Sequence, residues 1–108
     1  MTIRTERHGD TFVVSVGGRL DGVTAADYEK TIRELIDNGT TRIVADFDEL
    51  SYISSAGLRE IIVTAKLLQE KSGQFGLANV HGNVLSVFNM CGMEGVLKIH
   101  PSVADALA

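Results

Sequence analysis

The sequence predicts an α/β fold with a mostly parallel central β-sheet of about five strands, covered by about four helices. Three observations support this fold class. Apolar residues recur at strand spacing in some segments and at helical spacing in others, the two kinds of segment alternate along most of the chain, and no repeat or low-complexity linker interrupts them. Strand–helix–strand alternation implies parallel pairing with right-handed crossovers. With 108 residues, 44% of them hydrophobic, we expect a single domain over residues 1–108.

The first two elements are predicted to form a β-hairpin. Residues 11–16 are rich in β-branched side chains and end at Gly17-Gly18, as is typical of a strand. Residues 3–7 alternate in the same way. His8-Gly9-Asp10 between them suits a hairpin turn.

The first helix is predicted to begin at Thr24. Apolar residues then recur at helical spacing, at Tyr28, Ile32, Leu35 and Ile36. Thr24 followed by Asp27 resembles a capping box with Asp in place of Glu, so Thr24 is interpreted as an N-cap. Gly39 supplies a helix stop.

The second half of the chain continues the alternation. Residues 42–47 form a short apolar run that suits a central strand buried on both faces. A second helix follows, with the apolar stripe Leu58, Ile61, Ile62, Ala65 and Leu68, and Ser72-Gly73 ends it. The remaining predicted elements are a strand at 75–80, a short helix at 84–88, a last strand at 96–99 and a terminal helix starting near Ser102.

Composition excludes several classes of function. The net charge is −4 and Lys and Arg are not clustered, which disfavours nucleic-acid binding. No stretch of about 20 apolar residues could span a bilayer, and the first residues lack the apolar core of a signal peptide. We therefore expect a cytoplasmic protein without a membrane partner.

No cofactor or metal ion is expected. His8, His81 and His100 lack the spacing of a zinc site, and Asp46 and Asp48 are interpreted as solvated turn residues. The single Cys91 cannot form an internal disulfide and is interpreted as a packing residue at a helix end. The glycine-rich segments lack the Lys-Ser/Thr of a phosphate-binding loop.

The most informative segment is residues 46–58, where a buried strand runs into a polar turn and Ser54-Ser55 follows at the start of the next helix. One of the two serines is expected to cap that helix, since a Ser oxygen accepts from an unpaired helical N–H group. A phosphoryl group would be tolerated at the same place, because helix N-termini favour anions. It would add about two negative charges to an exposed surface.

Three segments resemble those of STAS-domain anti-sigma factor antagonists. Residues 50–58 are similar to the family's signature turn, an apolar lead-in followed by Asp-Ser-Ser-Gly-Leu or Asp-Ser-Thr-Gly-Leu. Residues 18–21 resemble its Gly-x-Leu-Asp element, and residues 89–93 its late helix-end segment. Element order and length match over essentially the whole chain, so the resemblance implies a STAS-like domain.

The resemblance also implies partner switching. Such proteins bind an anti-sigma factor, usually an ATP-dependent serine kinase, and so free a sigma factor. The kinase phosphorylates the Ser or Thr before the motif glycine, and a serine phosphatase reverses this. Here, with Gly57 matched to that glycine, Ala56 occupies the acceptor position and Ser54 the position of the Asp. Ser55 is therefore the first candidate acceptor and Ser54 the second.

The predicted partner-binding residues are Asp21, Thr24, Ser54, Ser55, Ala56, Gly57 and Leu58. Asp21 is equally well interpreted as a turn carboxylate. No catalytic residue is predicted, because no His lies in the segments adjacent to the serines to complete an acid–base constellation. Two alternatives stay open: a STAS-type binding module in a non-sigma switch that is not phosphorylated, which Ala56 favours, and a domain that binds a small ligand or nucleotide at the strand-to-helix end.

Overall fold

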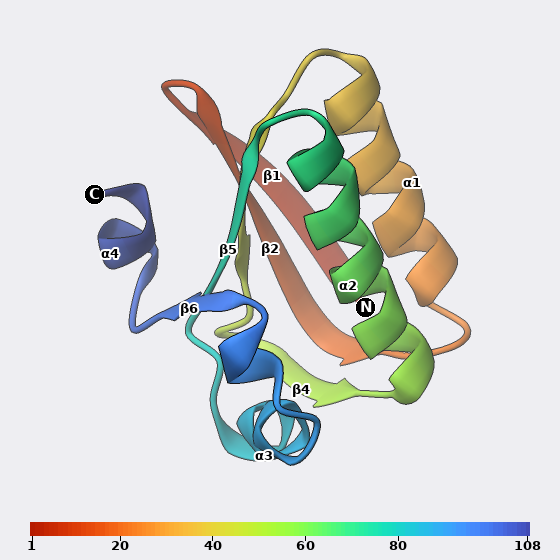
Figure 1. The fold of residues 1–108 in the computed structure, drawn as a ribbon. Helices are drawn as coiled ribbons and strands as arrows, with labels where there is room; N and C mark the ends of the chain where they lie inside the picture. Colours follow the sequence, from red (N-terminus) through yellow and green to blue (C-terminus); the bar gives the residue numbers. More distant parts are fainter.

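The computed structural model describes residues 1–108 and confirms the α/β class with a mostly parallel sheet. The sheet has six strands and runs in the order β1-β2-β3-β5-β6, while β4 pairs with β2 away from this path. Only the β1–β2 pair is antiparallel. Helices α1 and α2 lie side by side against one face, and α4 lies against the other (Figure 1).

The strands occupy the following ranges: β1 Thr2–His8, β2 Thr11–Leu20, β3 Arg42–Asp46, β4 Leu50–Ile53, β5 Gln74–Ala78 and β6 Lys98–His100. The helices are α1 Ala25–Asp37, α2 Ser55–Glu70, α3 Gly82–Met90 and α4 Val103–Leu107, with a 3-10 turn at Met93–Gly95. Both the predicted β1–β2 hairpin and the central position of β3 are confirmed.

The main core lies between the sheet and the α1–α2 layer. Alternate residues of β2, β3 and β5 point into it. The helices contribute Tyr28 and Ile32 from α1 and Ile61 and Leu68 from α2, and each of these four side chains is at most 2% exposed. A smaller cluster, Val13, Val44 and Ala78, lies on the opposite face beneath α4. Because β3 contributes to both clusters, it reads in the sequence as a continuous apolar run.

No strand was predicted between the buried strand and the serines, but residues 50–53 form β4. Leu50 and Ile53 are buried while Ser51 and Tyr52 are exposed, so this four-residue strand lacks the alternation by which strands are recognised. Parallel pairing with the end of β2 holds it in place. That pairing also carries β2 beyond the predicted stop at Gly17-Gly18, through a bulge at Gly18, whose φ is +84°.

The last strand starts later than predicted. Val96 and Leu97 follow the 3-10 turn, and the Leu97 N–H donates to the Met93 carbonyl instead of joining the sheet. Strand β5 ends at Ala78 because Asn79 has a φ of +60°. No helix combines the length and the apolar character that crossing a bilayer requires.

Candidate functional site

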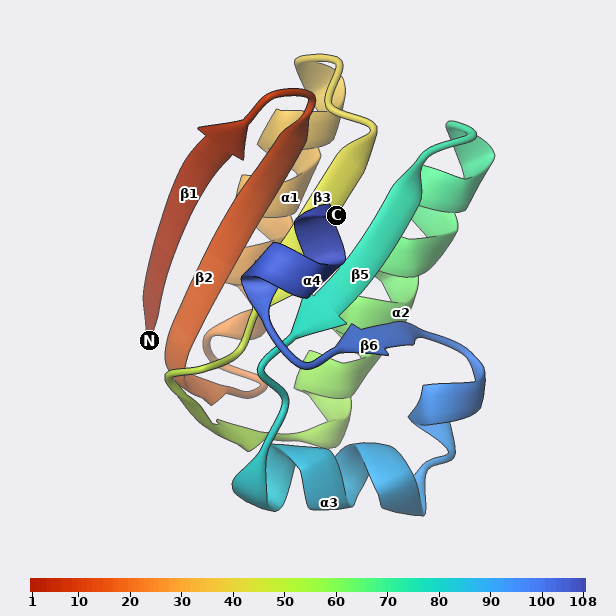
Figure 2. The ribbon, with the colours of Figure 1, turned by 90° about the vertical axis from the view of Figure 1, so that its left-hand side faces the viewer.

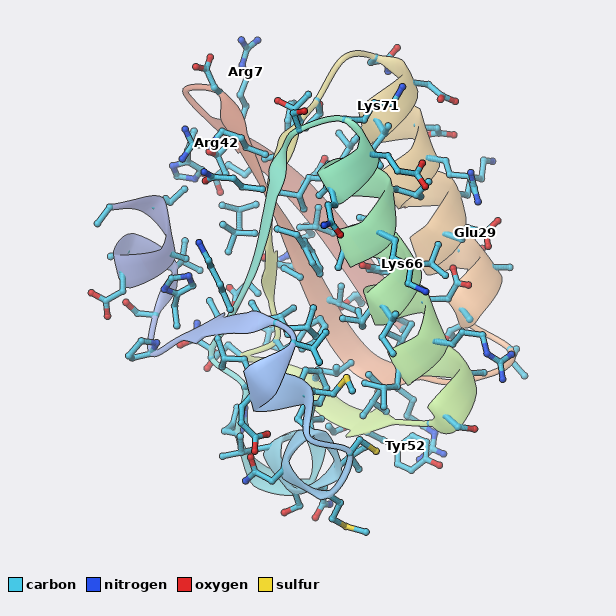
Figure 3. The ribbon with its side chains drawn as sticks, in the orientation of Figure 1. Arg7, Glu29, Arg42, Tyr52, Lys66 and Lys71 are labelled. Atoms are coloured by element: carbon cyan, nitrogen blue, oxygen red, sulfur yellow. The ribbon has the colours of Figure 1, made fainter.

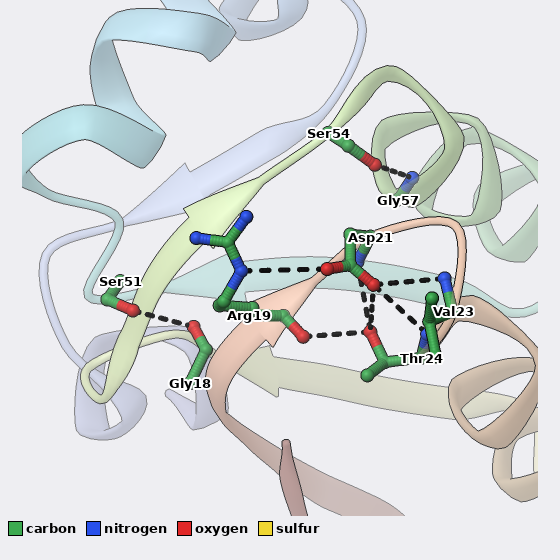
Figure 4. A network of polar contacts seen from close by, with 8 residues as sticks. All are labelled: Gly18, Arg19, Asp21, Val23, Thr24, Ser51, Ser54 and Gly57. Atoms are coloured by element: carbon green, nitrogen blue, oxygen red, sulfur yellow. Dashed lines mark hydrogen bonds and ion pairs between the residues drawn. The ribbon is translucent and has the colours of Figure 1, made fainter.

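Strands β2 and β4 run parallel and end together, which brings the Arg19–Thr24 segment next to the serine turn (Figure 4). Leu20 and Ile53 are partners in the register, and the Ser54 N–H donates to the Leu20 carbonyl at 3.0 Å. The expected proximity of Asp21 to the serines follows from this one strand pair. It also places the site at the carboxyl end of parallel strands, where ligands and partners commonly bind in α/β folds.

Ser54 is the residue that caps α2. Its backbone is extended, with φ −94° and ψ 175°, and its Oγ accepts from the Gly57 N–H at 3.2 Å. The prediction that one of the two serines caps the helix is thus confirmed and assigned. Ser55, the first helical residue, is exposed and its hydroxyl makes no hydrogen bond within the protein. The two adjacent serines therefore have different environments.

Gly57 and Leu58, in the first turn of α2, are buried against the rest of the fold. A Cβ on Gly57 would lie 2.5 Å from the Leu20 carbonyl oxygen, so only glycine allows α2 to approach β2 this closely. Leu58 is 8% exposed and packs into the main core. Both were grouped with the partner-binding residues, but their burial gives them a structural role; Ala56 between them and Ser55 is half-buried.

Asp21 organises the loop that precedes α1. Its Oδ1 accepts from the Val23 N–H at 3.0 Å and from the Thr24 N–H at 3.2 Å. These backbone donors, that of Thr24 first, hold the pKa of the Asp21 carboxyl below its ordinary value. The interpretation of Asp21 as a turn carboxylate is confirmed, and Asp21 carries a negative charge at neutral pH.

Thr24 stands at the N-cap position, but its side chain caps no helical N–H group. Its hydroxyl donates to the Arg19 carbonyl at 2.8 Å and accepts from the Asp21 N–H at 2.9 Å. The predicted capping role of the Thr24 side chain is therefore wrong, because the preceding loop already uses the hydroxyl. Thr24 instead closes that loop.

Two residues that the sequence did not single out, Arg19 and Tyr52, form the centre of the surface. The Arg19 Cζ lies 4.0 Å from the centroid of the Tyr52 ring, and the Arg19 Nε lies 3.6 Å from Asp21 Oδ2. The stacking is a cation–π contact that orders both side chains. Arg19 and Tyr52 are partners in the β2–β4 register, and since β4 was not predicted, no sequence signal joined them.

An exposed apolar side chain, Val23, completes this surface. Val23 is 87% exposed and Tyr52 is 38% exposed, whereas most large apolar residues are buried. Exposed apolar groups surrounded by polar residues are typical of protein-binding patches. We define the serine-turn surface as Arg19, Asp21, Val23, Thr24, Tyr52, Ser54, Ser55 and Ala56.

Asp46, Asp48 and Cys91 lie outside the serine-turn surface. Asp46 was interpreted as a solvated turn residue, but it is the last residue of β3 and half-buried, and its Oδ1 accepts from the Asp48 N–H at 3.1 Å and from Asn79 Nδ2 at 2.9 Å. Asp48 is exposed in the turn that follows, as predicted. No three His, Cys, Asp or Glu side chains come together as metal ligands. Cys91 was expected to pack at a helix end, but it is exposed, because α3 ends there and the chain turns away at Gly92, whose φ is +68°.

Comparisons with known proteins agree with this geometry. The family model described as the STAS domain matches residues 2–106. The BtrV protein of Bordetella bronchiseptica is 28% identical over 108 residues, covering 100% of this chain and 93% of BtrV. The anti-sigma-F factor antagonist RsfB of Mycobacterium tuberculosis is 25% identical, covering 99% and 87%. The crystal structure of an anti-sigma factor antagonist from Mycobacterium paratuberculosis superposes with a TM-score of 0.89, at 27% identity and with 98% and 90% coverage.

Proposed function

This chain belongs to the STAS domain family, and we propose that it is an anti-sigma factor antagonist that binds an anti-sigma factor through its serine-turn surface and so frees a sigma factor. Relatives that bear this description match the chain over nearly its full length. The observation that carries the proposal is the serine-turn surface itself, where exposed Val23 and Tyr52 lie among polar residues at the end of the β2–β4 strand pair. The protein acts by binding, without catalysing a reaction.

More specifically, the partner that we propose is an anti-sigma factor with serine kinase activity. Ser55 supports this choice, because it is exposed, free of internal hydrogen bonds and located at the first residue of α2. A phosphoryl group at a helix N-terminus is favoured by the helix dipole, so the modified protein stays folded. A phosphatase then restores the binding form.

Phosphorylation would break the complex by charge. A phosphoserine carries about −1.5 to −2 charges at neutral pH, next to a surface that already holds the Asp21 carboxylate. An interface formed around Val23 and Tyr52 would have to desolvate that charge. Since the cap made by Ser54 does not involve Ser55, the effect is confined to the interface.

The test measures binding between this chain and purified anti-sigma factors of its own organism by calorimetry. Ser55→Glu is expected to weaken binding at least about tenfold, which corresponds to 1.4 kcal/mol. Ser86→Glu is the matched control, since Ser86 is an exposed serine on α3 outside the serine-turn surface, and it is expected to bind as the wild type does. Equal affinities for the wild type and Ser55→Glu would contradict the proposed interface.

Phosphopeptide mapping tests the regulation separately. The tryptic peptide of residues 43–59 contains both Ser54 and Ser55. We expect phosphate on Ser55, because the Ser54 hydroxyl is engaged in the helix cap. Ser55→Ala should abolish labelling by the partner kinase, whereas Ser86→Ala should leave it unchanged.

A second candidate function is favoured by Ala56. The residue before Gly57 has no hydroxyl, and a STAS-type module can present the same surface without being phosphorylated, in a switch that does not involve a sigma factor. In that case the peptide stays unmodified in resting and stressed cells, while Ser55→Glu still weakens binding to the partner.

A further inference from the structure

A cavity of about 460 Å³ opens at the far end of the sheet from the serine-turn surface. The starts of β2, β3 and β5 contribute Thr11, Arg42 and Gln74, and β6 contributes Lys98 and His100. Helix α4 lies over the same face of the sheet, as Figure 2 shows. Cavities of this size are typical of small-molecule sites.

Sheet register explains why basic and polar side chains meet here. Thr11 is the register partner of Arg42, and Arg42 that of Gln74, so the three residues project from one face. Lys98 and His100 are two apart on β6 and share a face of that strand. Figure 3 shows Arg42 extending from the sheet on the side where α4 lies.

Gly76 makes room for the His100 ring. A Cβ at Gly76 would lie 3.3 Å from both Cδ2 and Nε2 of His100, so the imidazole lies directly over this glycine. Gly76 and Val44, its register partner, thereby leave a low apolar floor beneath the basic side chains. A larger residue at position 76 would displace the ring.

The basic side chains of this cavity have no acidic side chain as a partner, although the last residue, Ala108, also lines the cavity. No Asp or Glu side chain lines it, and Arg42, Lys98 and His100 take part in none of the ion pairs or side-chain hydrogen bonds. Basic groups lining a concave apolar wall concentrate positive potential where an anion would enter.

We propose that this cavity binds a small phosphate-bearing anion, free or as an organic ester. Arg42 supplies a planar donor fork and Lys98 a point charge, the two modes by which proteins hold phosphate. The His100 ring adds an N–H donor, and the apolar floor accommodates the carbon part of an ester. None of the cavity residues belongs to the serine-turn surface, so anion binding and partner binding are compatible.

The test is an NMR titration of the ¹⁵N-labelled protein with inorganic phosphate, glucose 6-phosphate and adenosine 5′-monophosphate, at an ionic strength held constant with sodium chloride. Saturable shifts are expected for the amides of Thr11, Arg42, Gln74–Gly76 and Lys98–His100. The relative affinities of the three probes distinguish free phosphate from an ester.

Two variants and one control decide the outcome. Arg42→Gln and Lys98→Gln should each raise the Kd of the best probe by about tenfold, as expected for the loss of one charge-assisted contact. Lys66→Gln removes the same charge from the exposed face of α2, outside the cavity, and should leave the Kd unchanged. Shifts that do not saturate with any probe, or an equal loss in Lys66→Gln, would overturn the proposal.

Discussion

The backbone carbonyl of Leu20 lies so close to Gly57 that a Cβ on Gly57 would be 2.5 Å from its oxygen. The same carbonyl accepts the Ser54 N–H at 3.0 Å. Leu20 therefore fixes both the position of the serine turn and the approach of α2, and this one contact couples the end of β2 to the surface proposed to bind the partner.

Replacing Gly57 should destabilise the fold. Gly57→Ala places a methyl group against the Leu20 carbonyl and within 3.0 Å of side-chain carbons of Ile53 and Leu20, so we expect a loss of about 1–3 kcal/mol. Urea unfolding measures it. Gly22→Ala is the control, because nothing lies within 4 Å of its Cβ and it should change stability by less than about 0.5 kcal/mol.

The two serines should respond differently to substitution by alanine. Ser54→Ala removes the hydrogen bond to the Gly57 N–H and should cost about 1 kcal/mol. Ser55→Ala removes no internal hydrogen bond and should be close to neutral. Thermal unfolding of the two variants side by side checks this, and equal losses would show that Ser54 is not the cap.

A buried hydroxyl pair joins α1 and α2, with the Tyr28 and Thr64 oxygens 2.7 Å apart. The Thr64 hydroxyl donates to the Glu60 carbonyl, so Tyr28 is the donor in the pair. Thr64→Val leaves the Tyr28 donor buried without an acceptor and should cost about 1–3 kcal/mol. Tyr28→Phe leaves Thr64 bonded to Glu60 and should cost about 1 kcal/mol. If denaturant unfolding gave the opposite order, the donor assignment would be wrong.

Because of Tyr28, we expect the stability of the native state to fall at alkaline pH. Burial raises the pKa of Tyr28 above its ordinary value, so the native state keeps the proton at a pH where the unfolded chain releases it. Stability from this group is complete below about pH 10 and falls as the pH rises above it. We expect stability curves from pH 8 to 11 to fall less steeply for Tyr28→Phe than for the wild type.

Because of Asp21, we expect the stability of the native state to fall at acidic pH. Because the backbone N–H groups of Thr24 and Val23 hold its pKa below the ordinary value, the charged form stabilises the native state. That contribution is complete above about pH 4 and is lost as the pH falls through the native pKa. Asp21→Asn keeps an acceptor oxygen but cannot titrate, so its stability should fall less than that of the wild type between pH 5 and 2. Parallel curves would contradict the lowered pKa.

Local sequence patterns predicted the fold class and the position of the serine turn. The 3.6-residue spacing around Tyr28 and Ile32, the apolar run at 42–47 and the Ser at the start of α2 each reflect interactions within a few residues, which a sequence displays directly. The cap could be predicted for the same reason, since the Ser54 oxygen and the Gly57 N–H are three residues apart.

What only the tertiary structure decided depends on contacts between distant segments. Strand β4 exists because it pairs with β2, about 30 residues earlier, and that pairing alone brings Arg19 onto Tyr52 and Gly57 against Leu20. The basic cavity likewise depends on the register of β2, β3 and β5 with β6, which brings together Arg42 and His100 from opposite halves of the chain. A short strand without alternation has no local sequence pattern, so β4 could not be predicted. The neighbours of an exposed charged side chain are set by strand register and packing, so the basic cavity could not be predicted either.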